Sequence, residues 1–572
     1  MEILKTLPPS AAYDVVVIGA GGAGLSTALF AALEGASVLL VEHTQFVGGT
    51  TAWSAGTTWI PGTHHAAKVN PDDTLHAART YLDAAIGDHA APSLRQAFLD
   101  HGAAAIKRIE ELTDVQYRAC PKHPDYISDL PGSTLNGRAL EPLPFDARLL
   151  GDLFALVRPP IPEFTVLGGM MVDRTDINHL LGMTGSWASF KHSLKIILRH
   201  ASDRLRYPRG TRWVMGNALV GRLLLSLSKQ AKVTLALNTS LEQLGNAGQP
   251  AGSAIQQVTL SQNGQRCSVT VRAGVVLASG GFNRNAAQRT EKLPGGNQAW
   301  CPGAPGHTGV ALDLARMRGG HFAEGAKSHA FWAPVSLRKR ADGTTAVFPH
   351  FVMDRAKPGF VTVNQAGQRF VNESTSYHLF GLAMQATDSV PAYLVCDAPA
   401  LKKYGIGMVR PGGKGLQPFL ADGYLTEGAS LEQLASKLGI DAAGLQRSVE
   451  QMNRYAQTGL DPDFGRGTTA YSQNIGDATA GNKNPNLGPL QTAPYYAVKL
   501  YPGDIGAATG LATDASARVL DASGAPIAGL YAVGNDMHSI MGGVYTAPGI
   551  TIGPGLVFSF IAARHAVTTR VS

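Results

Sequence analysis

The chain contains 572 residues, of which 66 are glycine, 33 are proline and 44% are hydrophobic. This length exceeds the usual span of one hydrophobic core and the composition excludes a disordered polymer, so we expect a loop-rich α/β enzyme of two or more domains. The four cysteines are scattered, with no Cys-x-x-Cys pair and no zinc spacing. That pattern argues against a disulfide framework and a metal centre, and it suits a reducing compartment.

The N-terminal segment and the apolar segments bear on localisation. The first ten residues lack the basic-then-apolar pattern of a signal peptide. No apolar run approaches the roughly 18 residues that are needed to cross a bilayer. We therefore expect a soluble cytoplasmic protein.

The net charge of +7 is concentrated in one segment. Between Lys191 and Arg212 lie seven Lys or Arg residues and one acid, Asp203, so this segment supplies +6 of the charge. Apolar residues recur beside these cations at helical spacing from Trp187 onward. The simpler interpretation is an amphipathic helix with a solvated face, and the alternative is peripheral contact of residues 187–212 with the inner face of an anionic membrane. We expect no nucleic-acid partner, because the stripe is short and carries no binding motif.

A predicted buried strand over residues 13–18 runs into Gly19-x-Gly21-x-x-Gly24. A helical pattern follows, and the next strand ends on Glu42. Glycines in this arrangement let backbone amides approach a pyrophosphate at a helix N-terminus, and the acid accepts hydrogen bonds from ribose hydroxyls. The agreement of strand, glycines, helix and acid predicts a dinucleotide site.

Beyond residue 62 the pattern predicts helices over about 72–112 and 145–206, and alternating strands and helices over 214–330. Apolar strands that end in glycine recur at residues 275–282 and 529–535. We therefore expect distant segments to share one sheet, in a nucleotide-binding fold that insertions interrupt.

The loop from Phe46 to Gly56 consists largely of small residues, which permit close backbone contact with a pyrophosphate and a flat ring. Together with the blocks at residues 534–536 and 550–553, this loop resembles the fumarate reductase/succinate dehydrogenase flavoprotein superfamily. The resemblance extends along nearly the whole chain and implies FAD, with Glu42 on the adenosine ribose. The cofactor-binding residues that it implies are Gly19, Gly21, Gly22, Gly24, Glu42, Gly48, Gly49, Thr50, Thr51, Ser54, Gly56, Ser279, Gly280, Gly534, Asn535, Asp536, Ile550, Thr551 and Ile552.

The attachment of the flavin and its electron acceptor are also predicted. Superfamily members that bind flavin covalently have a histidine just before the Thr-x-Ala run, whereas this chain has Gly49 or Thr50 there. We therefore predict noncovalent FAD. Two further glycine pairs, at 216–221 and 306–309, lack a preceding strand and a downstream acid, so no second dinucleotide site is predicted. The expected acceptor is a quinone or another diffusible electron carrier.

The block that ends at Tyr377 indicates the substrate class. In the superfamily's fumarate reductases, an arginine that acts on the dicarboxylate follows the pattern Arg-Phe-x-Asn-Glu, and here Tyr377 occupies that position after Arg369 to Glu373. The His-Gly-x-Asn-Arg block of those enzymes is also replaced, by Gly542 to Gly549. Both cations are absent, which argues against a small diacid, because two carboxylates would be desolvated without partners.

Tyr377 and the spacing Tyr545-x-x-x-Gly549 resemble the 3-ketosteroid Δ1-dehydrogenases instead. The segment around Tyr126 is similar to the region where that family has an active-site tyrosine. The resemblance implies Tyr126, Tyr377, Tyr545 and Gly549 as the catalytic set, and an apolar cyclic ketone as the substrate.

The chemistry explains these residue types. Desaturation next to a ketone removes a proton from the α-carbon while a hydride leaves the β-carbon for flavin N5. The Tyr545 hydroxyl and the Gly549 amide can polarise the carbonyl. Tyr377 would accept the proton as a phenolate, which requires either that its pKa fall from about 10 or that Tyr126 donate a hydrogen bond to it.

Other functions remain open in the sequence. A Δ4-(5α)-ketosteroid dehydrogenase, or a dehydrogenase of a smaller cyclic ketone, would use the same groups. A noncatalytic flavin-binding or membrane-attached sensor would need none of them. The predicted architecture is α/β: a Rossmann-type FAD-binding domain at 1–325 and 506–572 with helical insertions at about 65–213, and a smaller α+β catalytic, or capping, domain at 326–505.

Overall fold

The computed structural model describes residues 1–246, 248–352 and 354–570. Its larger sheet has nine strands in the order β1-β11-β3-β2-β14-β13-β12, with β22 also paired to β14 and β21 to β22. The strands are β1 (Glu2–Leu4), β2 (Ser10–Ile18), β3 (Val38–Val41), β11 (Val233–Ala236), β12 (Thr239–Leu244), β13 (Gln257–Gln262), β14 (Gln265–Leu277), β21 (Arg518–Leu520) and β22 (Pro526–Ala532).

The centre of this sheet is parallel and joins distant parts of the chain. β14 pairs in parallel with β2 on one side and with β22 on the other, so the two later strands predicted from glycine-ended apolar runs do share a sheet with the first. Val15, Val16 and Val17 in β2 are fully buried, as expected of a parallel strand that helices cover on both faces.

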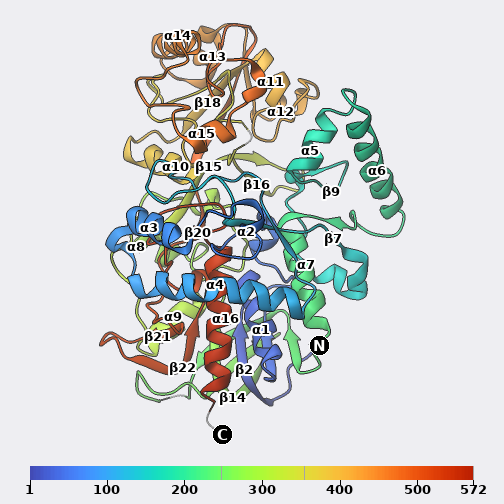
Figure 1. The fold of residues 1–572 in the computed structure, drawn as a ribbon, viewed down its shortest axis with the longest axis vertical. Helices are drawn as coiled ribbons and strands as arrows, with labels where there is room; N and C mark the ends of the chain where they lie inside the picture. Colours follow the sequence, from blue (N-terminus) through green and yellow to red (C-terminus); the bar gives the residue numbers. More distant parts are fainter. Residues whose placement is uncertain (247, 353, 571–572) are drawn as a thin grey trace.

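Two helices from opposite ends of the chain pack together on this sheet. They are α1 (Gly22–Leu33), which follows β2, and α16 (Ile552–Thr568), near the C-terminus. The Ser559 hydroxyl donates a hydrogen bond of 2.8 Å to the Ala23 carbonyl, which ties the middle of α16 to the first turn of α1. Figure 1 shows α1 and α16 beside β2 in the lower half of the molecule.

A second sheet, of six strands, lies at the opposite end of the molecule in Figure 1. Successive residues of β18 pack into two different hydrophobic clusters, Leu394 and Cys396 into one and Tyr393 and Val395 into the other, so both faces of this sheet are covered. The strands are β15 (Ala330–Lys339), β16 (Thr345–Pro349), β17 (Phe360–Val363), β18 (Ala392–Asp397), β19 (Thr426–Gly428) and β20 (Tyr495–Ala507). The surrounding helices are α10 (Tyr377–Ala386), α11 (Ala398–Tyr404), α12 (Gln417–Ala421), α13 (Leu431–Leu438), α14 (Ala442–Thr458) and α15 (Ala470–Ile475).

The segment between β3 and β11 contains helices and short strand pairs. The helices are α2 (Ala66–Val69), α3 (Leu75–Ile86), α4 (Pro92–Leu112), α5 (Arg174–Leu181), α6 (Trp187–Asp203) and α7 (Met215–Ser228), and α8 (Ala286–Lys292) and α9 (Val310–Met317) follow later. The strands are β4 (Thr58–Trp59), β5 (Tyr117–Ala119), β6 (Ala139–Pro142), β7 (Phe145–Asp146), β8 (Thr165–Val166), β9 (Met170–Met171) and β10 (Arg212–Trp213).

The prediction of a helical segment over 145–206 is wrong for its first half. Residues 145–173 form 3₁₀ turns and short strands, and α-helix begins only at Arg174. Prolines at 159, 160 and 162 and glycines at 168 and 169 interrupt the helix here, because proline removes a backbone donor and both glycines take positive φ.

Helix α6 turns an apolar stripe outward. Ser193, Ile196 and His200 face the protein, whereas Trp187 is 76% exposed and Leu198 is 60% exposed. Together with α5, α6 stands at one side of the molecule in Figure 1. Among the described residues, no helix has the length and hydrophobicity that crossing a membrane would require.

Not all seven cations of this segment are free to meet a partner. Arg199 pairs with Asp146 at 3.1 Å and Arg212 with Asp176 at 2.7 Å. The buried Arg209 donates to Asn217. The exposed cations are Lys191, Lys195, Arg204 and Arg206.

Candidate active site

An elongated cavity of about 480 Å³ connects the glycine-rich end of the larger sheet with the base of the smaller one. At one end it is lined by Gly21, Gly22 and Glu42, and at the other by Tyr377 and Tyr545. Residues that are distant in the sequence therefore line one continuous space.

The first glycines shape the junction of β2 and α1. A Cβ atom on Gly19, whose φ is +104°, would lie 2.4 Å from the Ala278 carbonyl oxygen, and one on Gly24 would lie 1.7 Å from the Gly19 oxygen. Gly21 has open space at the Cβ position. Gly19 and Gly24 thus allow the strand and helix to pack closely, and Gly21 leaves room for a ligand at the helix N-terminus.

The carboxylate of Glu42 is held in place at the end of β3. Its Oε2 accepts a hydrogen bond of 2.9 Å from the Ala20 amide, and its Oε1 accepts one of 2.7 Å from the Thr44 hydroxyl. Arg158 donates to the same hydroxyl at 2.8 Å. These contacts fix an acid against the glycine loop, where it lines the cavity.

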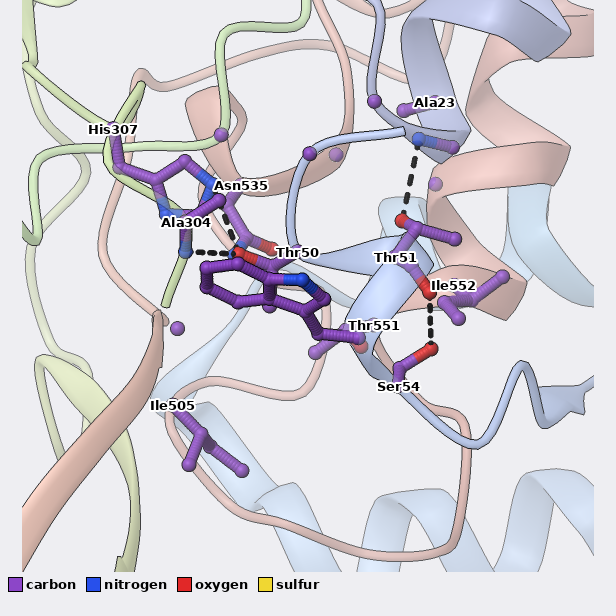
Figure 2. Close-up of a pocket in the computed structure, with 18 of the residues that line it drawn as sticks. Ala23, Thr50, Thr51, Ser54, Ala304, His307, Ile505, Asn535, Thr551 and Ile552 are labelled. Carbon is purple, nitrogen blue, oxygen red and sulfur yellow. Dashed lines mark hydrogen bonds between the residues drawn. The ribbon is translucent and has the colours of Figure 1, made fainter. Parts of the chain in front are cut away.

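Thr50 and Thr51 occupy the middle of the cavity wall (Figure 2). The Thr50 hydroxyl accepts from the Ala304 amide at 2.9 Å and lies 3.2 Å from Nε2 of His307. The Thr51 hydroxyl accepts from the Gly22 amide at 3.2 Å. The small-residue loop predicted from the sequence therefore links the first glycine motif to the opposite wall.

Asp536 connects the C-terminal block to the loop after β14. Its buried carboxylate accepts hydrogen bonds from the Ser279 amide and, at 2.8 Å, from the Gly281 amide. Burial raises the pKa of this carboxyl above its usual value. Asp536 thus organises the loop and does not itself line the cavity.

Most of the predicted cofactor-binding residues line the cavity. Four do not, namely Gly24, Gly48, Ile550 and Asp536. Those that do are Gly19, Gly21, Gly22, Glu42, Gly49, Thr50, Thr51, Ser54, Gly56, Ser279, Gly280, Gly534, Asn535, Thr551 and Ile552. The two glycines that do not line the cavity, Gly24 and Gly48, allow close packing. A Cβ on Gly48 would lie 2.9 Å from the Ala52 side chain.

Three of the predicted catalytic residues form a tyrosine cluster, defined by Tyr126, Tyr377 and Tyr545. The Tyr126 hydroxyl donates a hydrogen bond of 3.2 Å to the Tyr377 hydroxyl. The ring centroids of Tyr377 and Tyr545 lie 5.0 Å apart, and those of Tyr126 and Tyr545 lie 5.7 Å apart. All three line the cavity and are nearly buried, so the phenols share one desolvated wall.

The proposed role of Tyr377 as a base requires either a lowered pKa or a hydrogen bond from Tyr126. The electrostatics of the cluster do not meet the first of these two conditions. Burial raises the pKa of Tyr377 well above its usual value, and the phenols of Tyr126 and Tyr545 act in the same direction. The first condition, a fall in this pKa, is therefore not met, because the residue has lost water without gaining a contacting cation among the described residues. The other condition, a hydrogen bond from Tyr126, is met by the geometry.

Gly549 lies where two backbone segments approach closely. Its φ is +88°, and a Cβ atom there would lie 2.4 Å from the Thr57 carbonyl oxygen. The Gly549 carbonyl accepts from the Trp59 amide at 3.2 Å, and among the described residues its own N–H makes no hydrogen bond. A backbone donor beside Tyr545 is therefore available to a ligand in the cavity, which Gly549 lines.

Several cavity features were not predicted from the sequence. Phe331 and Phe351 pack edge-on against Tyr545 and Tyr377, with centroids 5.0 and 4.8 Å apart. Arg355 is fully buried, and its charge opposes the increase that burial causes in the pKa of Tyr126. A single arginine in a loop carries no sequence signal that would have identified this role.

Arg369 and Glu373 have a structural role, as their block suggested. Arg369 bridges Glu373 and Asp461, each at 2.8 Å. Burial would raise the pKa of Glu373, but the guanidinium groups of Arg369 and Arg466 hold it below its usual value. This buried network shapes the turn that precedes Tyr377.

The residues present fit a flavin dinucleotide. The N-terminus of α1, which begins after Gly21, lines the cavity with Gly21 and Gly22, and the fixed acid Glu42 lines it too. Such a helix end attracts a pyrophosphate, and the acid suits a ribose. Beyond this end the cavity continues to the aromatic wall formed by the tyrosine cluster.

Comparison with known proteins supports the same cofactor. The family described as FAD binding domain matches residues 14–552. The 4-oxocyclohex-2-ene-1-carboxylate 5-dehydrogenase of Sinomonas cyclohexanicum is 38% identical over 97% of this chain and 93% of that protein. The 3-oxosteroid 1-dehydrogenase of Mycobacterium tuberculosis is 34% identical over 97% of this chain and 98% of that protein.

A solved structure shows the same fold throughout. The 3-ketosteroid Δ1-dehydrogenase from Sterolibacterium denitrificans, in complex with 1,4-androstadiene-3,17-dione, has a TM-score of 0.91 and 35% identity, covering 98% of this chain and all of that chain. The chain therefore belongs to the FAD binding domain family and, within it, to the 3-ketosteroid Δ1-dehydrogenases and their relatives, and it is an FAD-dependent oxidoreductase.

Proposed function

We propose that the protein desaturates the α,β bond of a cyclic ketone, most specifically the C1–C2 bond of a 3-ketosteroid. The observation that carries this proposal is the tyrosine cluster beside the Gly549 N–H, which makes no hydrogen bond to any residue that the structure describes, because these groups are neutral donors suited to a ketone. The relatives named above act on steroids and on an oxocyclohexene carboxylate, which fits the same reactive ring.

Each member of the cluster has a proposed role. The Tyr545 hydroxyl and the Gly549 N–H donate to the ketone oxygen and stabilise the enolate charge that develops there. Tyr377 accepts the α-proton, and Tyr126 stabilises the resulting phenolate through its hydrogen bond. Bound FAD supplies the two-electron chemistry by accepting the β-hydrogen as a hydride at N5.

We infer that FAD is held noncovalently by the cavity residues named above, with Glu42 on the adenosine ribose. Support comes from positions 49 and 50, where glycine and threonine stand and no histidine is present to form a histidyl linkage. Acid precipitation tests this inference: flavin released into the supernatant supports it, and flavin retained in the pellet contradicts it.

Anaerobic mixing with androst-4-ene-3,17-dione tests the reaction. We expect the bound flavin to bleach and the product to carry a new C1–C2 double bond by NMR. A 5α-reduced 3-ketosteroid converted only to its Δ4 product would instead favour a Δ4-(5α)-dehydrogenase. Flavin that no cyclic ketone bleaches would contradict the proposed function and favour a sensor.

We also propose that the protein docks on an anionic membrane through α6 and delivers electrons to a quinone. The outward apolar stripe of Trp187, Leu194 and Leu198 is flanked by exposed Lys191 and Lys195, which is the arrangement of interfacial helices. Three outward apolar residues on one helix, beside two exposed lysines, support the membrane interpretation.

We propose the domain division 1–325 with 506–572 for FAD binding and 326–505 for the cap. The six-stranded sheet, from Ala330 to Ala507, supports these limits. In this division the tyrosine cluster is assembled from both domains, since Tyr377 comes from the cap and Tyr126 and Tyr545 from the FAD-binding domain.

A further inference from the structure

Two polar side chains line the cavity beyond the tyrosine cluster. His123 lies three residues before Tyr126 in the same loop, and Arg174 is the first residue of α5. Apolar residues of this part of the wall include Phe164 and Phe351, and the latter packs on Tyr377. A ketone held by the cluster therefore extends toward a region that contains a positive charge.

Arg174 has no acidic partner of its own in the part of the chain that the structure describes. The acids beside it in sequence are engaged elsewhere: Asp173 and Asp176 cap the start of α5 and both pair with Arg212. Arg174 is also exposed to solvent and lines the cavity. Its guanidinium is thus free to meet an anion that enters the cavity.

His123 provides a second, independent observation. Its Nδ1 is shielded from solvent and has no hydrogen-bond partner among the described residues. Burial lowers the pKa of His123 to about 3, and the charge of Arg174 acts in the same direction. The imidazole therefore stays neutral and offers its unpaired ring nitrogen to a ligand, because a shielded polar atom without a partner costs free energy.

We propose that Arg174 and His123 form a subsite for a carboxylate carried by the ketone substrate, at the end remote from the reacting carbonyl. This inference rests on the proposed desaturation of a cyclic ketone. The neutral tyrosine cluster binds the ketone, and the arginine selects substrates by the charge at their other end. Two substrates share this chemistry: a small oxocyclohexanecarboxylate, and a 3-ketosteroid with an acidic side chain.

Matched substrate pairs test the subsite on the FAD-loaded protein. One pair is 4-oxocyclohexanecarboxylate and its methyl ester, and the other is 3-oxo-23,24-bisnorchol-4-en-22-oate and its methyl ester. For the acid that fits the subsite, we expect Arg174→Gln to raise KM about 10-fold with little change in kcat. We expect Arg174→Gln to change the KM of the corresponding ester by less than about 2-fold. We expect Arg174→Lys to retain part of the preference for the acid over the ester.

Controls separate this effect from a general loss of charge or fold. Arg447→Gln removes an exposed arginine on α14, outside the cavity, and should leave the KM and kcat of every substrate unchanged. His123→Phe keeps an aromatic ring but removes the ring nitrogens. It should weaken binding of the acid more than binding of its ester. The proposal would be overturned if Arg174→Gln raised KM equally for acid and ester, or if it raised KM for neither acid.

A binding measurement keeps the subsite testable if the proposed function itself fails. Cyclohexanecarboxylate has no ketone and cannot be desaturated, so its affinity can be measured by calorimetry without turnover, with the steroid acid titrated in parallel. We expect Arg174→Gln to raise the Kd of the acid that fits about 10-fold. Failure of all ketones to bleach the flavin would contradict the reaction alone, whereas the same Kd in parent and variant, or no binding to the parent, would overturn the subsite.

Discussion

The hydroxyl of Tyr126 donates a hydrogen bond of 3.2 Å to the hydroxyl of Tyr377, although the two residues are 251 positions apart. The loop that carries Tyr126 is fixed by its amide, which donates to the Thr546 carbonyl at 2.8 Å, directly beside Tyr545. Tyr377 is the first residue of α10, which Ser376 caps. Backbone contacts thus position all three phenols at one wall of the cavity.

Tyr377→Phe removes the proposed base and should lower turnover of a cyclic ketone by several orders of magnitude with FAD still bound. The phenyl ring keeps the packing against Phe351 and Tyr545, so the fold should persist. Steady-state assays with an artificial acceptor measure the effect, and Tyr495→Phe, on β20, is the matched control. Near-normal turnover would remove Tyr377 from the mechanism.

Tyr545→Phe should raise the barrier by roughly 3 kcal/mol, or reduce kcat about 100-fold, because one of two donors to the developing enolate is lost. The Gly549 N–H should sustain the residual rate. Single-turnover bleaching of the flavin isolates the chemical step from release of product. An unchanged bleaching rate would mean that the carbonyl binds elsewhere.

The rate should rise with pH across the alkaline range. Burial raises the pKa of Tyr377, so the phenol is protonated near neutrality and the reactive phenolate becomes more populated only as pH increases. Profiles of kcat/KM from about pH 7 to about pH 10 measure this dependence. Tyr126→Phe should lower kcat/KM throughout this range, since the forming phenolate loses its hydrogen-bond donor, and a rate unaffected by that substitution would contradict the role of Tyr126.

Glu42→Ala should weaken FAD binding by about 10-fold or more, because a charged acceptor for the ribose and the anchor of the Ala20 amide are both lost. Reconstitution of the apoprotein, followed by flavin fluorescence, gives the Kd. Glu34→Ala removes an acid from the end of α1 that pairs with Arg108, away from the cavity, and should not change this value.

Replacing Trp187 and Leu198 by serine should reduce sedimentation with both anionic and neutral liposomes, since the outward stripe of α6 would lose its apolar contacts. Lys191→Gln with Lys195→Gln should reduce only the dependence on lipid charge. The parent protein remaining entirely in the supernatant with both kinds of liposome would contradict membrane docking.

The sequence predicted those parts of the site that depend on local backbone patterns. A strand, three glycines and an acid specify the junction of β2, α1 and β3, because each element is set by neighbours in the chain. The sequence could not show, by contrast, that Gly24 and Gly48 serve packing and do not contact a ligand. Close packing and close contact with a ligand each require a glycine, so the residue type does not distinguish them.

Features that depend on burial in the tertiary structure were harder to predict from the sequence. The pKa of Tyr377 was expected to fall as one of two alternatives, whereas burial among neutral phenols raises it. The outward direction of Trp187 and Leu198 likewise depends on which side of α6 packs on the protein, because both sides of the helix carry apolar residues. Arg174 and His123 carried no motif, and Arg174 is related to Tyr126 only by the cavity that both line.

The most direct measurement is a crystal structure of the FAD-loaded protein with a bound cyclic ketone. We predict that the ketone oxygen lies within hydrogen-bonding distance of both the Tyr545 hydroxyl and the Gly549 N–H, with the α-carbon facing Tyr377. A ketone oxygen that contacts neither group, in a complex that turns over in the crystal, would contradict it.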